Sequence, residues 1–245
     1  MNQADLPQVS VGAESHIGTA RENNEDALSV RSELGLWVVA DGMGGAAAGE
    51  VASALAVEEI VARVARGEGL VEAIQGAHRA ILAAPARGRG SVGMGTTVVA
   101  LRLHPNSYEL AWVGDSRAYL FREGKLRQLS RDHSLVQSMV DRGEITPQEA
   151  RFHPHRNIIT RVLGALESTG VMSERVGGTT HRGDVLLLCT DGLNGEIDDE
   201  TISAVLSAAE GPQKAAERLV EAALSAGGQD NITALVVAVD QDPER

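Results

Sequence analysis

The sequence is poor in cysteine and in aromatic residues, and each shortage excludes a class of protein. Cys189 is the one cysteine among 245 residues, so an intramolecular disulfide and a disulfide-stapled secreted fold are excluded. Aromatic residues make up 2% of the chain and hydrophobic residues 43%, so Ala, Val, Leu and Ile must build the core. No stretch approaches the roughly 18 apolar residues of a membrane-spanning helix.

Basic residues are also scarce, with 22 Lys and Arg against 34 Asp and Glu and a formal net charge of −12. A surface of this sign repels nucleic acids and anionic membranes, so we expect neither as a partner. The polar residues 1–15 lack a signal-peptide core, and we expect a cytoplasmic protein. An anionic substrate would need positive charge from arginine or from bound metal.

Several templates for phosphate or acyl chemistry are missing. The sequence contains neither a nucleotide P-loop nor an EF-hand calcium loop. Cys189 has Gly195 where a cysteine-phosphatase loop has arginine, and its apolar surroundings indicate a core residue. Ser91 follows Arg89 at a position where a nucleophile elbow requires glycine. A covalent nucleophile is therefore not indicated.

The apolar pattern predicts alternating blocks of strands and helices. We expect strands at 26–32, 35–41, 96–103, 108–113, 117–121, 184–189 and 232–239. We expect helices at 46–66 and 70–83, and amphipathic helices around 202–209 and 216–223. The short connections within 96–121 predict an antiparallel meander. A helix pair after each strand block predicts two packed antiparallel sheets with helices outside.

Residues 131–165 are the least regular stretch and contain His133, His153 and His155. Such a stretch between strand-rich blocks indicates an inserted lid or flap. Surface or loop-bracing roles are favoured for these histidines, and a role in proton transfer stays open. We find no linker, so we expect residues 1–245 to form one domain.

Aspartates stand at the ends of four apolar runs. Asp41, Asp115 and Asp191 directly follow such runs, and Asp230 precedes another. Because opposite ends of antiparallel neighbours lie side by side, these four carboxylates are expected to converge. Their repulsion must be offset, and Mg²⁺ or Mn²⁺ does so directly because both prefer oxygen ligands. Each aspartate alone could simply begin a turn, but the repeated placement favours a shared site.

Glycines and charges flank this predicted site. The segment 41–45, Asp-Gly-Met-Gly-Gly, lets backbone carbonyls such as that of Gly42 approach a ligand closely. Arg21 shortly precedes Glu25 and Asp26, and its planar fork matches two phosphate oxygens. The adjacent acids could hold water on a cation. Taken alone, these clusters also fit a glycine turn and a solvated loop.

In this order along the chain, the motifs resemble those of metal-dependent Ser/Thr protein phosphatases of the protein phosphatase 2C type, in their compact bacterial form. The resemblance extends from about Val9 to Val239. Its motifs are Arg21 with Asn24-Glu25-Asp26, Asp41-Gly42-Met43-Gly44-Gly45, Gly95-Thr96-Thr97, Gly114-Asp115-Ser116-Arg117, Arg131-Asp132-His133-Ser134, Thr190-Asp191-Gly192-Leu193 and Asp230-Asn231-Ile232-Thr233.

The resemblance implies an α+β fold, a four-layer α-β-β-α sandwich of two antiparallel sheets flanked by helix pairs, with the flap beside the site. It implies two core Mn²⁺ or Mg²⁺ ions. Asp41, Asp191 and Asp230 would hold one ion, and Asp41 with the Gly42 carbonyl would hold the second.

Further residues would surround these ions. Glu25 and Asp26 would contact them directly or through water, and Asp115 with Asp191 would hold a weaker third ion. Arg21 would bind the substrate phosphate, so that Arg21, Asp41 and Asp191 form the catalytic set.

The activity implied is hydrolysis of phosphoserine and phosphothreonine in proteins by a hydroxide that bridges the cations, without a phosphoenzyme. The implied partners are phosphorylated proteins, including a Ser/Thr kinase or its substrates, and the implied state is a monomer. Relatives often carry a histidine, proposed as general acid, at the places of Met43 or Ala46. Two alternatives stay open: a pseudophosphatase used as a binding module, and a hydrolase of a small phosphorylated metabolite.

Overall fold

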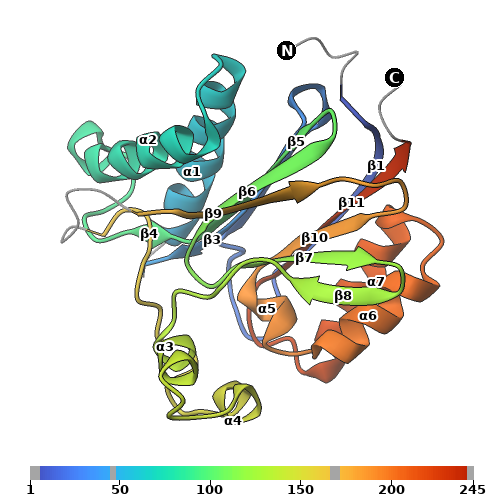
Figure 1. Ribbon diagram of the computed structural model, residues 1–245. Coiled ribbons are helices and arrows are strands. Elements are labelled where there is room, and N and C mark those ends of the chain that lie inside the picture. Colours follow the sequence, from blue (N-terminus) through green and yellow to red (C-terminus); the bar gives the residue numbers. More distant parts are fainter. Residues whose placement is uncertain (1–5, 45–47, 166–171, 242–245) are drawn as a thin grey trace.

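Two antiparallel β-sheets lie face to face at the centre of the molecule (Figure 1). The computed structural model describes residues 6–44, 48–165 and 172–241. The first sheet contains, in order, β1 (Gln8–His16), β11 (Ile232–Gln241), β10 (Val185–Cys189), β7 (Arg117–Arg122) and β8 (Lys125–Gln128). The second sheet contains, in order, β2 (Asp26–Arg31), β3 (Leu36–Met43), β5 (Val98–His104), β6 (Ser107–Val113) and β9 (Glu174–Thr179), with the short β4 (Gly95–Thr96) paired to the end of β3.

Helices cover the outer face of each sheet (Figure 1). The second sheet is covered by α1 (Ala48–Ala65) and α2 (Leu70–Ala83). The first sheet is covered by α6 (Asp199–Ala208) and α7 (Pro212–Ala226), beside the short α5 (Asp191–Asn194). This arrangement confirms the predicted α+β fold and its α-β-β-α layers. Within the described part of the chain, no helix has the length and hydropathy needed to cross a bilayer.

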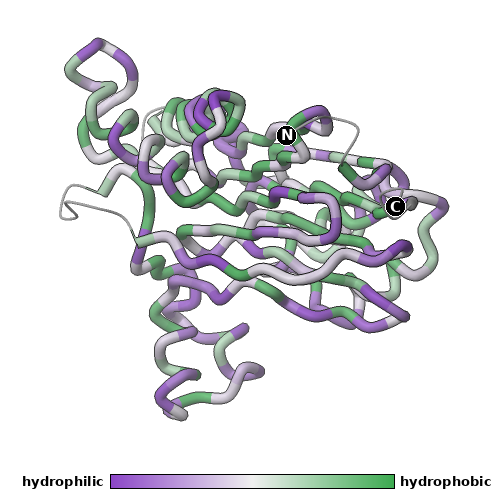
Figure 2. Tube along the Cα trace, turned by 45° about the horizontal axis from the view of Figure 1, so that its top comes forward, coloured by the Kyte–Doolittle hydropathy of each residue, from purple (hydrophilic) through white to green (hydrophobic). Residues whose placement is uncertain are grey.

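Three apolar layers hold the sheets and helices together. Along β3, Val38 and Ala40 pack towards α1 and α2, whereas Trp37 and Val39 pack between the sheets, as the two-residue repeat of a strand requires. The third layer lies between the first sheet and α5 to α7. Ala, Val, Leu and Ile dominate all three layers, as the scarcity of aromatic residues predicts. Figure 2 shows hydrophobic residues concentrated along the central strands.

The predicted meander over 96–121 is wrong in its third strand. β5 and β6 pair as expected, but β6 then pairs with β9, and β7 joins the first sheet beside β10 and β8. The chain changes sheets at Gly114, whose φ of 109° lies in a region that favours glycine. A Cβ on Gly114 would lie 2.5 Å from the side chain of Thr97. This crossing places the residues after Gly114 at one end of the sandwich.

Residues 131–165, here called the flap, project from the sandwich (Figure 1). Within this least regular stretch of the sequence, the flap contains two short helices that the sequence did not predict, α3 (Leu135–Asp141) and α4 (Pro147–Arg151). Ser134 caps the start of α3, and Thr146 caps the start of α4 in a capping box. Helices this short show no apolar period in the sequence.

Candidate active site

Five aspartates from distant parts of the sequence converge at one end of the sandwich. Asp26 and Asp41 are register partners on β2 and β3. Asp191 begins α5, with one residue between it and β10, and Asp230 is separated from β11 by one residue. Asp41 is in electrostatic contact with Asp26, Asp115, Asp191 and Asp230. We call these five residues the acidic cluster. The strand that holds Asp41 does not end there as predicted, because β4 pairs with β3 beyond it.

Burial makes this concentration of negative charge costly. Burial raises the pKa of Asp26 to about 7. It also raises the pKa of Asp41 and Asp115 well above the usual range, and repulsion from Asp191 adds to the shift at both. The pKa of Asp191 is raised by burial and then by Asp230. The carboxyl groups therefore need protons or cations to be stable together.

Two of the cluster's carboxylate oxygens are fully buried and have no hydrogen-bond partner in the described structure. Asp26 Oδ2 accepts hydrogen bonds from Thr190 Oγ1 at 2.9 Å and Thr233 Oγ1 at 2.6 Å, but Asp26 Oδ1 and Asp115 Oδ1 are buried without one. Buried unpaired oxygens of this kind suit a hard divalent cation. Over the described ranges, no group of three or more His, Cys, Asp and Glu side chains is arranged so that it could hold a metal ion as it stands. The fit to Mn²⁺ or Mg²⁺ rests on the oxygen donors of the cluster and not on a preformed ligand geometry.

Gly42 and Glu25 lie where the start of α1 meets the cluster. The Gly42 amide donates to the Glu25 carbonyl at 3.1 Å, and a Cβ on Gly42 would lie 2.2 Å from the Gly49 carbonyl oxygen. Only glycine allows this approach. Ser53 Oγ donates to the same Glu25 carbonyl at 2.6 Å. The Glu25 side chain lies against Gly49 in the first turn of α1.

Arg21 supplies positive charge at the edge of the cluster. Its Nη2 lies 2.6 Å from Asp230 Oδ2, and its side chain is 52% exposed. This hydrogen bond raises the pKa of Arg21, which keeps its charge fixed. The guanidinium is therefore accessible to a substrate and adjacent to the carboxylates.

The sequence motifs did not reveal how these residues are fixed in place. Asn231 binds the loop that carries Arg21, because its Nδ2 donates to the carbonyls of Ile17 and Asn23 at 2.9 Å each. Its Oδ1 accepts from the Glu25 amide at 2.8 Å. Asn231 follows Asp230 in a motif already noted, which is the one signal that points to it.

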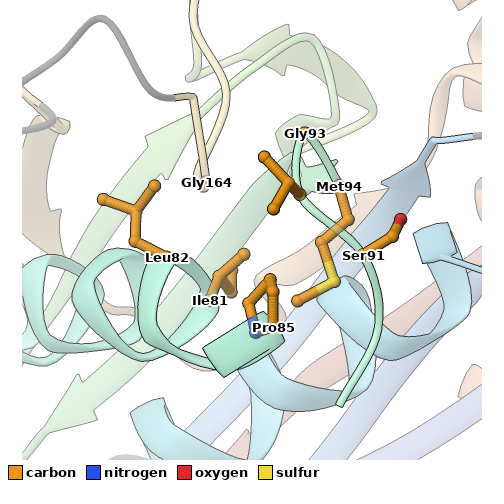
Figure 3. A pocket seen from close by; sticks show the side chains of 8 residues that line it. Ile81, Leu82, Pro85, Ser91, Gly93, Met94 and Gly164 are labelled. Carbon is orange, nitrogen blue, oxygen red and sulfur yellow. The ribbon is translucent and has the colours of Figure 1, made fainter. Parts of the chain in front are cut away.

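Cys189 and the flap histidines lie outside the acidic cluster. Cys189 is fully buried in the core, as predicted, and burial raises the pKa of its thiol to about 12. His133 is buried and bonded at both ring nitrogens, which agrees with a bracing role. His153 and His155 contact each other. A small hollow lies between the end of α2 and the segment around Met94 (Figure 3), and none of the five aspartates lines it. Its lining is Ile81, Leu82, Pro85, Ser91, Val92, Gly93, Met94 and Gly164.

Together, the fold and site define an α-β-β-α sandwich protein with a partly buried acidic centre suited to divalent cations, beside an arginine suited to phosphate. The chain belongs to the protein phosphatase 2C family, whose model matches residues 14–226.

Relatives in several bacteria support this assignment. The serine/threonine protein phosphatase PstP of Mycobacterium tuberculosis is 41% identical over 237 residues, which cover 94% of this chain and 45% of PstP. The serine/threonine phosphatase stp of Listeria monocytogenes is 36% identical over 236 residues, which cover 91% of this chain and 93% of stp. The chain therefore spans less than half of PstP but nearly all of stp.

Solved structures show the same fold. A crystal structure of PstP superposes with a TM-score of 0.88 at 38% identity, covering 95% of this chain and 99% of that one. A structure of the PstP catalytic domain in complex with two manganese ions gives a TM-score of 0.85 at 38% identity, with the same coverage.

Proposed function

We propose that this protein is a Mn²⁺- or Mg²⁺-dependent phosphatase that hydrolyses phosphoserine and phosphothreonine in proteins. The observation that carries the proposal is the acidic cluster, with its buried unpaired oxygens, beside the half-exposed Arg21. The names of the PstP and stp relatives support this activity, and the manganese complex of PstP supports the cofactor.

The cluster offers ligands for two core ions and a third. Asp41, Asp191 and Asp230 would hold one ion, and Asp41 with the Gly42 carbonyl would hold the second. Around these ions would lie Glu25 and Asp26, directly or through water, and Asp115 with Asp191 would hold the third. Bound divalent cations supply Lewis acidity, which makes water nucleophilic near neutral pH and offsets phosphate charge.

The protein's own residues would bind and orient the substrate. Arg21 would exchange its exposed ion pair with Asp230 for two phosphate oxygens, which a guanidinium fork matches. Thr190 and Thr233 hold Asp26 in one orientation through their hydroxyl groups. His133 uses Nδ1 to accept from Gly114 and directs Nε2 to Glu174, so we do not assign it the transfer of a proton to the leaving group.

The proposal extends to the setting of the enzyme. We infer that residues 1–245 act as one catalytic domain with the flap beside its site, that the protein is a cytoplasmic monomer, and that it opposes a Ser/Thr kinase. The last point follows from the substrate class, since phosphoserine and phosphothreonine are the products of such kinases.

Hydrolysis of p-nitrophenyl phosphate and of a phosphothreonine peptide, each with Mn²⁺, Mg²⁺ or EDTA, tests the function. We expect Mn²⁺ to support both reactions and EDTA to abolish both. Asp191→Asn should lose activity, and Asp199→Asn, the same change at an exposed aspartate, should retain it. Activity on p-nitrophenyl phosphate alone would favour a small-metabolite hydrolase. Inactivity on both despite bound Mn²⁺ would favour a pseudophosphatase.

A further inference from the structure

His133 joins the flap to the turn that carries Asp115. The His133 side chain is buried, and its Nδ1 accepts a hydrogen bond from the Gly114 amide at 3.1 Å. The His133 amide donates to the Gly114 carbonyl at 2.9 Å. Because Nδ1 accepts, the ring proton must lie on Nε2. Two hydrogen bonds therefore join His133 to Gly114, one through the ring and one through the backbone.

The other contacts of the ring agree with this tautomer. Nε2 lies 3.1 Å from Glu174 Oε1 on β9, and Arg161 Nη1 lies 3.3 Å from the same oxygen. Nε2–H and Arg161 therefore both donate to Glu174, although Arg161 Nη1 is also 3.3 Å from Nε2. Trp112 stacks on the ring, with centroids 6.4 Å apart. The Trp112 Nε1 donates to the Arg131 carbonyl at 2.8 Å.

The Asp115 turn is held on its other side by the strand of Asp41. Ser116 Oγ and Thr97 Oγ1 are 2.7 Å apart, and the Asp41 amide donates to Thr97 Oγ1 at 3.1 Å. Asp115 thus lies between a contact to the flap and a contact to the centre of the cluster. Asp115 Oδ1 is buried without a partner, so its position depends on how firmly this turn is held.

We propose that His133 is a positioning residue that couples the flap to the third cation position, by holding the Gly114–Asp115 turn through its ring and its backbone. The inference rests on the proposed function for the role of Asp115. Loss of the ring contact would let the turn shift and would weaken the weakest-bound ion. The two core ions, whose proposed ligands do not include Asp115, would change little.

Variants at position 133 separate the roles of the two ring nitrogens. His133→Asn places an amide oxygen near the former Nδ1 and keeps an acceptor for Gly114, whereas His133→Gln places its amide near Nε2. Each metal-free protein is titrated with Mn²⁺, and free Mn²⁺ is counted by electron paramagnetic resonance. We expect His133→Gln and His133→Ala to weaken the last ion by about 10-fold or more, and His133→Asn to remain near the unaltered protein.

His153→Ala is the matched control, because the ring of this flap histidine contacts His155. This variant should bind Mn²⁺ like the unaltered protein. Equal Mn²⁺ binding by the Ala, Asn and Gln variants at position 133 would overturn the proposal. It would leave the proposed function intact.

Nuclear magnetic resonance of the unaltered metal-free protein tests the contact even if a variant fails to fold. We expect a His133 ring protonated at Nε2 only, and a Gly114 amide protected from hydrogen exchange. A ring protonated at Nδ1, or a rapidly exchanging Gly114 amide, would overturn the proposal. If the expected tautomer is found but the protein binds no Mn²⁺, the proposed function fails, and the link from His133 to a cation fails with it.

Discussion

Among single residues, Arg21 best illustrates how the site combines accessibility with charge. Its ion pair with Asp230 is short, but both side chains are exposed to solvent, at 52% and 38%. Pairs this exposed contribute at most about 1 kcal/mol. The guanidinium can therefore leave Asp230 for a phosphate at little cost, and the charge it brings offsets the repulsion between substrate and acidic cluster.

Arg21→Ala should lower kcat/KM for a phosphothreonine peptide by about 10- to 100-fold, the effect of one or two hydrogen bonds between charged groups. Arg21→Lys should recover part of the loss, because it restores the charge without the planar fork. Steady-state kinetics with Mn²⁺ measures both variants. Arg66→Ala, at an exposed position at the end of α1, is the control. Unchanged kinetics in Arg21→Ala would refute the assigned role.

The aspartates of the cluster could be identified in the sequence, whereas the contacts that orient them could not. Asp41, Asp115 and Asp191 each follow an apolar run, and that pattern is local. The contacts of Thr190 and Thr233 to Asp26 arise only when β10 pairs with β11 beside β2. A threonine in a strand is common, so its hydroxyl gives no signal until the register is known. The ligand roles of the aspartates stay predictions.

At the scale of elements, the spacing of apolar residues and the position of helix-ending residues such as proline decided which helices and strands could be predicted. The helix predicted at 70–83 matches α2, because its apolar residues recur on one face and Pro85 follows. β9 escaped prediction because Glu174–Thr179 contains two glycines and alternates between half-buried and exposed positions. The predicted pairing of β7 with β6 was wrong, because β7 instead pairs with β10, which lies far along the chain, and with β8.

The returning end of the flap is anchored by one apolar side chain. Leu163 is fully buried in the layer under α1 and α2, and its backbone exchanges two hydrogen bonds with Thr96 on β4. Thr96 Oγ1 in turn donates to the Asp41 carbonyl at 2.8 Å. The flap is therefore linked to the acidic cluster through Leu163 and Thr96 as well as through His133.

Leu163→Ala should lower the free energy of unfolding by about 2–5 kcal/mol, because it leaves a cavity in a fully packed layer. Ile158→Ala, in the same flap but 45% exposed, should change it by no more than about 0.5 kcal/mol. Urea unfolding followed by circular dichroism compares the two. Similar losses in both variants would show that Leu163 does not anchor the flap in the core.

At the scale of the whole molecule, the net charge of −12 and the acidic cluster both lower the stability of the metal-free protein as the pH rises. Burial holds the pKa of Asp26 at about 7, against an ordinary value of about 3.9. Between these values the folded protein keeps a proton that the unfolded chain releases. The contribution of Asp26 to stability is therefore full at low pH and is lost as the pH rises through about 7. The raised pKa values of Asp41, Asp115 and Asp191 have the same sign.

The metal-free protein should therefore become less stable as the pH rises from about 5 to about 8, as measured by the midpoint of thermal unfolding. Saturating Mn²⁺ should restore stability most at the high end of this range, because an ion that binds only the folded state stabilises it. Asp26→Asn removes one titrating group and should flatten the metal-free slope. A metal-free protein that gains stability over this range would contradict the assigned electrostatics.

The most direct test of the central claim is an anomalous-scattering map from crystals grown with Mn²⁺. We expect peaks between Asp41, Asp191 and Asp230 and beside the Gly42 carbonyl, with a further peak near Asp115 at high Mn²⁺ concentration. Mn²⁺-dependent phosphatase activity together with a map in which these positions are empty, and peaks lie elsewhere, would contradict it.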